Sequence, residues 1–130
     1  MSFQTKVLVA CFCIVAFDAV ASVLSRIFEF EYIHFIWFSF ILYVVIGFWG
    51  AFRQGFGYGM LLGTIAGFTD STIGWFVSWL IGPFIQPKMP PLAVMLVAFV
   101  MVTVTASGFA LASFGALLCA LFKQTRRADP

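Results

Sequence analysis

Residues 55–83 read GFGYGMLLGTIAGFTDSTIGWFVSWLIGP, and Asp70 is the only charged residue among them. A membrane-spanning helix needs about 20 mostly apolar residues, which this stretch exceeds. In hydrocarbon the backbone must satisfy its own hydrogen bonds, so a span is a helix or a strand of a closed barrel. Barrel strands alternate apolar and polar residues, and this stretch does not. The sequence therefore predicts a transmembrane helix over 56–81.

Three further apolar runs predict spans over 7–28, 32–52 and 92–122. The composition agrees, because the 130 residues are 63% hydrophobic and only 9% charged. A soluble domain has about a quarter of its residues charged. Short connections make consecutive helices antiparallel neighbours. We predict an all-α integral membrane protein, a single domain over 1–130, whose four transmembrane helices form an up-down-up-down bundle.

The start of the chain allows an alternative. Lys6, the apolar run after it and Ala19-Val20-Ala21 match a signal peptide with an A-x-A cleavage site. Cleavage after Ala21 would leave three spans. Because the apolar character continues to residue 28, we expect the segment to remain as the first span. Sequencing the N-terminus of the mature protein distinguishes the two.

The distribution of Lys and Arg predicts the orientation, since cytoplasmic loops carry the excess of positive charge. With four spans, one side holds Lys6, Arg53, Lys123, Arg126 and Arg127, and the other holds Arg26 and Lys88. Both termini are therefore expected in the cytoplasm, and we place the protein in a bacterial inner membrane. The net charge of +2 is too small to indicate the basic surface of a nucleic-acid-binding protein, so the expected partner is the lipid bilayer.

Small residues recur along two of the predicted helices. Helices in lipid associate through close backbone approach, which small side chains permit. Four glycines follow each other at intervals of four residues, and the fourth span has a similar row. The predicted helix-packing residues are Gly55, Gly59, Gly63, Gly67, Gly74, Gly108, Ala112 and Ala116. They predict an interface, either within one chain or between the chains of a homo-oligomer.

Asp18 and Asp70 lie near the centres of the first and third spans. A carboxylate at the middle of a membrane costs about 2.5–3.5 kcal/mol on insertion scales. Each acid should therefore face the bundle or a wet cavity, or carry a proton, because loss of water penalises the charged form. Polar neighbours extend this candidate proton, cation or polar-core site: Ser22, Ser25, Thr69, Ser71 and Thr72.

Three interpretations of these acids compete. In the leading one, the protein is a small membrane protein of unassigned activity in which Asp18 and Asp70 only accept hydrogen bonds within a glycine-packed bundle. In the second, they make it a proton- or cation-coupled small transporter or channel. In the third, an acid meets another subunit, and the protein is an accessory part of a larger membrane complex.

Other chemistry has little support in the sequence. His34 is the only histidine, the three cysteines form no C-x-x-C pair, and no metal-spaced cluster or catalytic motif occurs. We therefore expect no metal, no cofactor and no enzymatic activity. The aromatic second span has two interpretations, a lipid-facing helix or the wall of a pocket for a hydrophobic ligand.

The size, the four spans and the carboxylate in the first helix resemble the small multidrug-resistance transporters in architecture. Those proteins carry Glu where this chain has Asp18, and their other sequence patterns are missing here. The resemblance implies a four-helix membrane fold, and no family is assigned on it.

Overall fold

The computed structural model describes residues 1–83 and 94–128, and the chain is almost entirely helical. Four helices are long and apolar enough to cross a membrane, which confirms the predicted all-helical, multi-pass class. The elements are α1 (Phe3–Phe28), the 3-10 turn η1 (Tyr32–Phe35), α2 (Ile36–Gln54), α3 (Phe56–Thr69), the π-helical turn η2 (Asp70–Gly74), α4 (Trp75–Ile81) and α5 (Val94–Ala128).

The helix boundaries differ from the predicted ones at both ends of the chain. The first helix begins at Phe3 instead of residue 7, because the Ser2 hydroxyl caps it by accepting the Thr5 N–H at 3.2 Å. It ends where Glu29 takes a left-handed conformation with φ of 53°. The last helix continues to Ala128, past the predicted end at 122.

The third span covers Phe56–Ile81, which confirms the predicted helix over 56–81, but a feature that we did not predict interrupts it. The backbone widens into a π-helical turn at η2 and then continues as α4. Two hydroxyls act on the same carbonyl just before the turn: Ser71 and Thr72 donate to the Phe68 carbonyl at 3.0 and 2.6 Å. Such bonds compete with the backbone ladder. Turns of this kind inside α-helices are frequent at functional sites.

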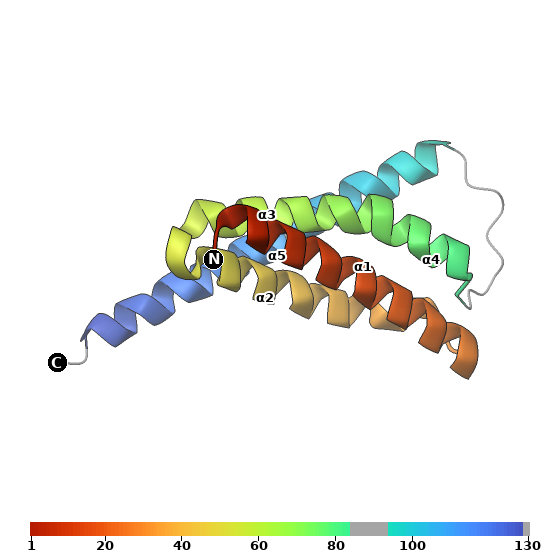
Figure 1. Ribbon diagram of the computed structural model, residues 1–130, viewed down its shortest axis with the longest axis horizontal. Helices are drawn as coiled ribbons and strands as arrows, with labels where there is room; N and C mark the ends of the chain where they lie inside the picture. The colour runs from red at the N-terminus through yellow and green to blue at the C-terminus, as the bar shows by residue number, and fades with distance from the viewer. Residues whose placement is uncertain (84–93, 129–130) are drawn as a thin grey trace.

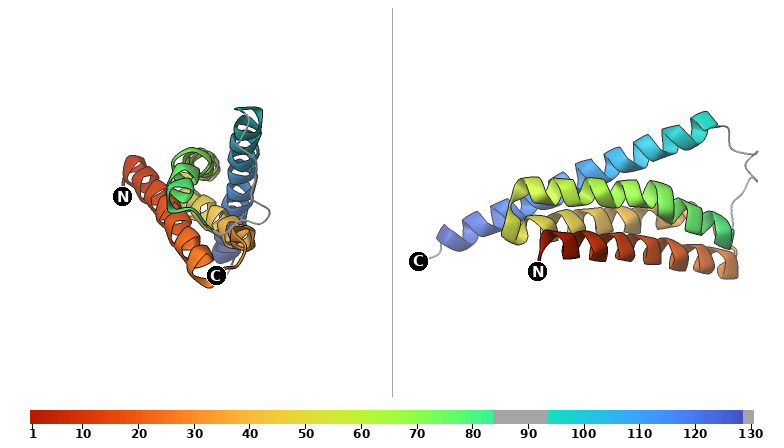
Figure 2. Two further views of the ribbon diagram at one scale, coloured as in Figure 1. Left: turned by 90° about the vertical axis from the view of Figure 1, so that its right-hand side faces the viewer. Right: turned by 45° about the horizontal axis from the view of Figure 1, so that its top comes forward.

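The first three spans lie side by side, and α5 crosses them at an angle (Figures 1 and 2). Within the described residues, α5 packs against α2, α3 and η2 but makes no close approach to α1 or α4. The N-terminus and the C-terminal end of α5 lie toward the same end of the bundle. At the other end α5 leans away from α4.

Small residues hold the half of the bundle nearer the termini, which we call the closed half. The glycine row of α3 faces the small-residue row of α5: a Cβ on Gly63 would overlap Ala112, and one on Gly67 would lie 3.2 Å from the Gly108 Cα. On α2, Gly47 also meets Ala112. The two rows thus face each other within one chain.

Gly55 departs from the predicted packing row. It occupies the turn between α2 and α3 with φ of 98°, and a Cβ there would meet no atom within 4 Å. A left-handed conformation favours glycine, so Gly55 serves the turn and not a helix contact.

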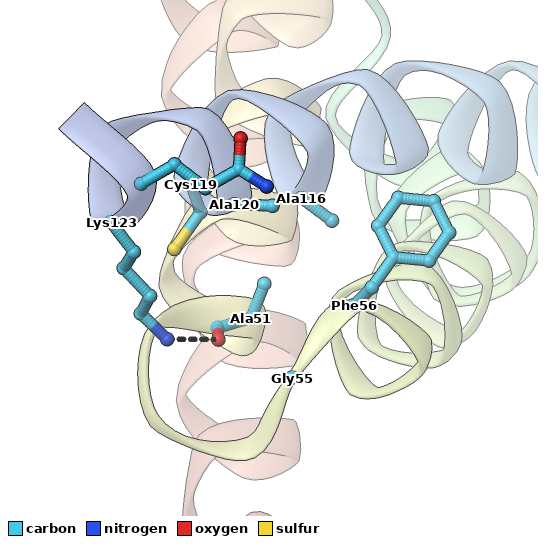
Figure 3. A pocket seen from close by; sticks show the side chains of 8 residues that line it. Ala51, Gly55, Phe56, Ala116, Cys119, Ala120 and Lys123 are labelled. Atoms are coloured by element: carbon cyan, nitrogen blue, oxygen red, sulfur yellow. Dashed lines mark hydrogen bonds between the residues drawn. The ribbon is translucent and has the colours of Figure 1, made fainter. Parts of the chain in front are cut away.

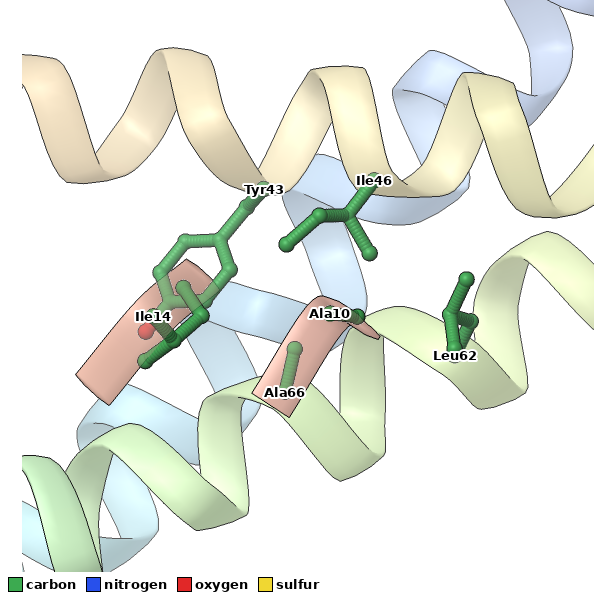
Figure 4. Close-up of a cluster of buried hydrophobic side chains, with 6 residues drawn as sticks. All are labelled: Ala10, Ile14, Tyr43, Ile46, Leu62 and Ala66. Atoms are coloured by element: carbon green, nitrogen blue, oxygen red, sulfur yellow. The ribbon is translucent and has the colours of Figure 1, made fainter. Parts of the chain in front are cut away.

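A buried apolar cluster fills the closed half between the first three spans (Figure 4). Each of three helices contributes two side chains, and none is more than 4% exposed. The cluster consists of Ala10, Ile14, Tyr43, Ile46, Leu62 and Ala66. It separates the middle of the bundle from the end that carries the termini.

Two lysines tie both ends of the chain to the end of α2. The Lys6 side chain, 4% exposed, donates to the Trp49 carbonyl at 2.9 Å, and Lys123 donates to the Ala51 carbonyl at 3.3 Å (Figure 3). Cations are favourable at a helix C-terminus, where the dipole is negative. Beside Lys123 lies a small cavity of about 260 Å³ with Cys119 on its wall.

Candidate functional site

A cleft of about 500 Å³ opens in the half of the bundle away from the termini. It lies between the first half of α2, the stretch from η2 to α4, and the first half of α5, where α5 leaves its neighbours. Its walls are mostly apolar and aromatic, with Phe35, Ile36, Phe40, Trp75, Val100 and Val104 among them. Five serine and threonine side chains are interspersed: Ser39, Ser71, Ser78, Thr103 and Ser107.

Asp18 and Asp70 both line this cleft and come from different helices. Their carboxyl groups converge on Gly74. Gly74 makes this possible: a Cβ there would overlap Asp18 Oδ2 and would lie 3.2 Å from Asp70 Oδ1. A residue without a side chain one turn after Asp70 thus admits the α1 carboxyl into the π-helical turn.

Each carboxyl has its own tyrosine donor. The Tyr43 hydroxyl donates to Asp70 Oδ2, and the Tyr32 hydroxyl donates to Asp18 Oδ1 at 3.2 Å. Tyr32 also lies 3.3 Å from the Ser78 hydroxyl. The second oxygen of Asp18 is buried and has no hydrogen-bond partner. In the part of the chain that the structure describes, no Lys or Arg acts on the Asp18 carboxyl.

Only three of the residues predicted to form the polar site line the cleft: Asp18, Asp70 and Ser71. Ser71 lines it with the two acids, and its hydroxyl lies 3.4 Å from that of Thr105, where α5 begins to lean away. Four predicted members lie outside the cleft lining: Ser22, Ser25, Thr69 and Thr72.

Three of these four side chains make hydrogen bonds away from the cleft, and the fourth makes none. Ser25 donates to the Phe30 carbonyl at 2.7 Å and steadies the end of α1. The Thr69 hydroxyl lies 3.3 Å from the Cys11 sulfur, which joins α3 to α1. Thr72 bonds back to its own helix, and the buried Ser22 hydroxyl has no partner.

Tyr32 contacts Asp18, although no pattern in the sequence singled it out. It begins the second span, a position typical of an interfacial aromatic anchor. The 3-10 turn η1 instead brings its hydroxyl to Asp18. Tyr43 was recognisable as a donor in the sequence, because it is a phenol near the middle of a span.

Among the described residues, neither a metal-binding cluster nor a known relative points to a function. Residues 1–83 and 94–128 contain no group of three or more His, Cys, Asp or Glu side chains that could share a metal ion. Comparison with protein families, curated proteins and solved structures finds no match for the chain.

Proposed function

We propose that the protein is a small proton-coupled transporter in which the Asp18–Asp70 pair carries the exchangeable proton. The observation that carries this proposal is the pairing itself: the buried Asp18 and the half-buried Asp70 meet at Gly74 on the floor of a cleft, and no described Lys or Arg lines it. Purely structural acids are expected to have all their oxygens satisfied, because a buried unpaired group costs about 1–3 kcal/mol.

Proton sharing accounts for the geometry of the pair. Two neighbouring carboxylates away from water cannot both stay ionised, so they hold a proton between them. A proton on Asp18 Oδ2, the buried oxygen without a partner, would lie at Gly74, where the Asp70 carboxyl also lies. The two tyrosine hydroxyls stabilise the single negative charge that remains. A second proton, or a cation from the cleft, can then neutralise the site.

The position of the cleft relative to the apolar cluster supports transport. Among the described residues, the cleft reaches the acids from the end away from the termini. The apolar cluster of the closed half, drawn in Figure 4, begins one helical turn from each acid, at Ile14 and Ala66. Tyr43 belongs to both regions, since its ring packs in the cluster and its hydroxyl donates to Asp70. Loss of the negative charge on Asp70 would weaken that hydrogen bond and so favour looser packing of the apolar cluster.

For the orientation, we propose that the four spans alternate across a bacterial inner membrane with both termini in the cytoplasm, as the distribution of Lys and Arg indicates. The cleft then opens to the outer side. A fluorescent protein fused after residue 130 should fold and fluoresce, whereas an alkaline phosphatase fused there should stay inactive. The reverse result contradicts this orientation.

The transport proposal is tested with purified protein in liposomes that contain a pH-sensitive dye and a preset acid interior. Addition of an exchanged cation should collapse the gradient, with Na⁺, K⁺ and ethidium as probes. The double variant Asp18→Asn/Asp70→Asn keeps the shape of both side chains and should slow the collapse about tenfold or more, equivalent to about 1.4 kcal/mol. Ser22→Ala, a buried change outside the cleft, is the matched control.

Two results would contradict the proposal. Wild-type flux in the double variant would make the acids structural. Absence of flux with all three probes, together with a stoichiometric partner in mild detergent extracts, would favour an accessory subunit. Circular dichroism of each variant shows whether it still folds, and the single Asn variants identify which acid exchanges its proton.

A further inference from the structure

We infer that one anionic phospholipid binds at the end of the bundle that carries the termini, with its phosphate at Lys123 and its glycerol in the cavity beside that residue. This inference goes beyond the proposed function and does not depend on transport. Two features carry it. Three positive side chains gather at this end without a described carboxylate, and the cavity beside them combines a cation with an apolar wall.

The three positive side chains meet at the last turns of α2. Lys6 donates to the Trp49 carbonyl at 2.9 Å. Lys123 donates to the Ala51 carbonyl, two residues further along α2, at 3.3 Å. Arg53 belongs to the last turn of the same helix, and its charge, like that of Lys123, repels the charge of Lys6. Because like charges held close together repel, the group favours the binding of an anion.

Among the described residues, nothing at this end neutralises the three charges. The described carboxylates lie at the cleft or at the far end of α1: Asp18, Asp70, Glu29 and Glu31. The helix dipoles compensate little, because the negative end of α2 and the positive end of α3 meet at Gly55. Each dipole is equivalent to about half a charge, of opposite sign at the two ends. The side-chain charges therefore remain for a ligand to neutralise.

Lys123 is the cation placed to contact the ligand. It lines the cavity, and one of the three N–H donors of its ammonium group is used by the described contact with the Ala51 carbonyl. Lys6 is 4% exposed and already donates to two carbonyls, so we assign it to packing. Figure 3 shows Lys123 on one side of the cavity and the Phe56 ring on the other.

The wall of the cavity favours a lipid over a free phosphate ion. Small or apolar residues form most of the lining: Ala51, Gly55, Phe56, Ala116, Cys119 and Ala120. Phe56 is also exposed, so the apolar wall reaches the surface of the bundle. An inorganic ion gains nothing from such a wall, whereas the carbon atoms of a lipid next to its phosphate leave water there. Basic residues beside a span attract the anionic lipids of the bilayer.

The test measures lipid binding to the full-length protein in detergent by native mass spectrometry. The probes are dioleoyl phosphatidylglycerol, which is anionic, dioleoyl phosphatidylcholine, which has the same tails and no net charge, and inorganic phosphate. The anionic lipid should bind saturably, with one molecule per chain, and about tenfold more tightly than the neutral one. Inorganic phosphate at the same concentration should not displace it.

Variants then locate the bound lipid. Lys123→Gln keeps a donor for the Ala51 carbonyl and should weaken binding about tenfold, the usual loss for a hydrogen bond to a charged group, and Lys123→Arg should retain it. Ala120→Leu keeps every charge, fills part of the cavity and should weaken binding by a similar factor. Arg126→Gln removes an exposed charge of the same helix outside the cavity lining, and it should leave binding unchanged.

Equal binding of the two lipids would overturn the inference. Equal losses in Lys123→Gln and Arg126→Gln, with none in Ala120→Leu, would also overturn it, because the attraction would then come from the diffuse charge of this end. Displacement by inorganic phosphate would identify a soluble phosphate as the ligand and overturn the lipid. The comparison of the two lipids uses the unaltered protein, so it decides the matter even where a variant fails to fold.

Discussion

The closed half and the cleft are built from the same helices but from opposite kinds of residue. In the closed half, glycine and alanine bring the backbones of α2, α3 and α5 into contact. Around the cleft, the continuations of these spans carry aromatic rings, hydroxyls and Asp70, and α1 adds Asp18. The difference teaches how the cleft arises: small residues hold α5 tightly at one half only, and its other half is left to diverge.

The largest expected effect comes from adding one carbon atom in the closed half. In Gly63→Ala the new Cβ would overlap Ala112 and approach the Gly108 carbonyl to 2.9 Å, and the backbone of α5 cannot yield without moving the helix. Overpacking of this kind costs about 1–3 kcal/mol, and we expect the upper end. Unfolding in mixed micelles measures it, and wild-type stability would contradict the close packing of α3 and α5.

The same added atom beside the cleft should act on function instead. In Gly74→Ala the Cβ meets the flexible tip of Asp18, which can swing aside and separate from Asp70. Flux should fall about tenfold, since each 1.4 kcal/mol of lost interaction is a factor of ten. The free energy of unfolding should change by less than in Gly63→Ala. A variant that unfolds as readily as Gly63→Ala would show that the two halves are not separable.

A smaller loss is expected where the N-terminus meets α2. Lys6→Met keeps most of the side-chain volume and removes the hydrogen bonds from Nζ to the Trp49 and Gly50 carbonyls. We expect a loss of about 1 kcal/mol, the usual net contribution of such a bond, and no change in flux. Reduced flux at unchanged stability would place Lys6 in the transport machinery and contradict the assignment of function to the cleft.

The smallest expected effect is a gain. Gly57 lies in the first turn of α3, and a Cβ there would meet no atom within 4 Å. Gly57→Ala should therefore stabilise the protein by about 0.5–1 kcal/mol, the usual difference between the two residues in a helix. It also serves as the control for Gly63→Ala. A loss of stability would reveal a neighbour at this position.

The spans were predictable from sequence, because both hydropathy and the need to pair backbone N–H and C=O groups in lipid act over whole segments. That Asp18 and Asp70 face the interior of the bundle was predictable too, because a membrane penalises each charge separately. Their encounter was not, since it depends on how α1 packs against η2 at Gly74. The cleft depends on the crossing angle of α5, and Tyr32 depends on a short turn. None of these leaves a periodic signal in the chain.

The π-helical turn at Asp70–Gly74 holds one residue more than an α-helical turn would, because it closes i→i+5 hydrogen bonds in place of i→i+4 ones. The loss of one codon within the turn, such as an in-frame deletion of Thr72, would therefore close it to a regular α-helix and leave α3 and α4 in phase. The glycine contacts of α3 would persist. The lesion would remove only the widened backbone that receives the Asp18 carboxyl at Gly74.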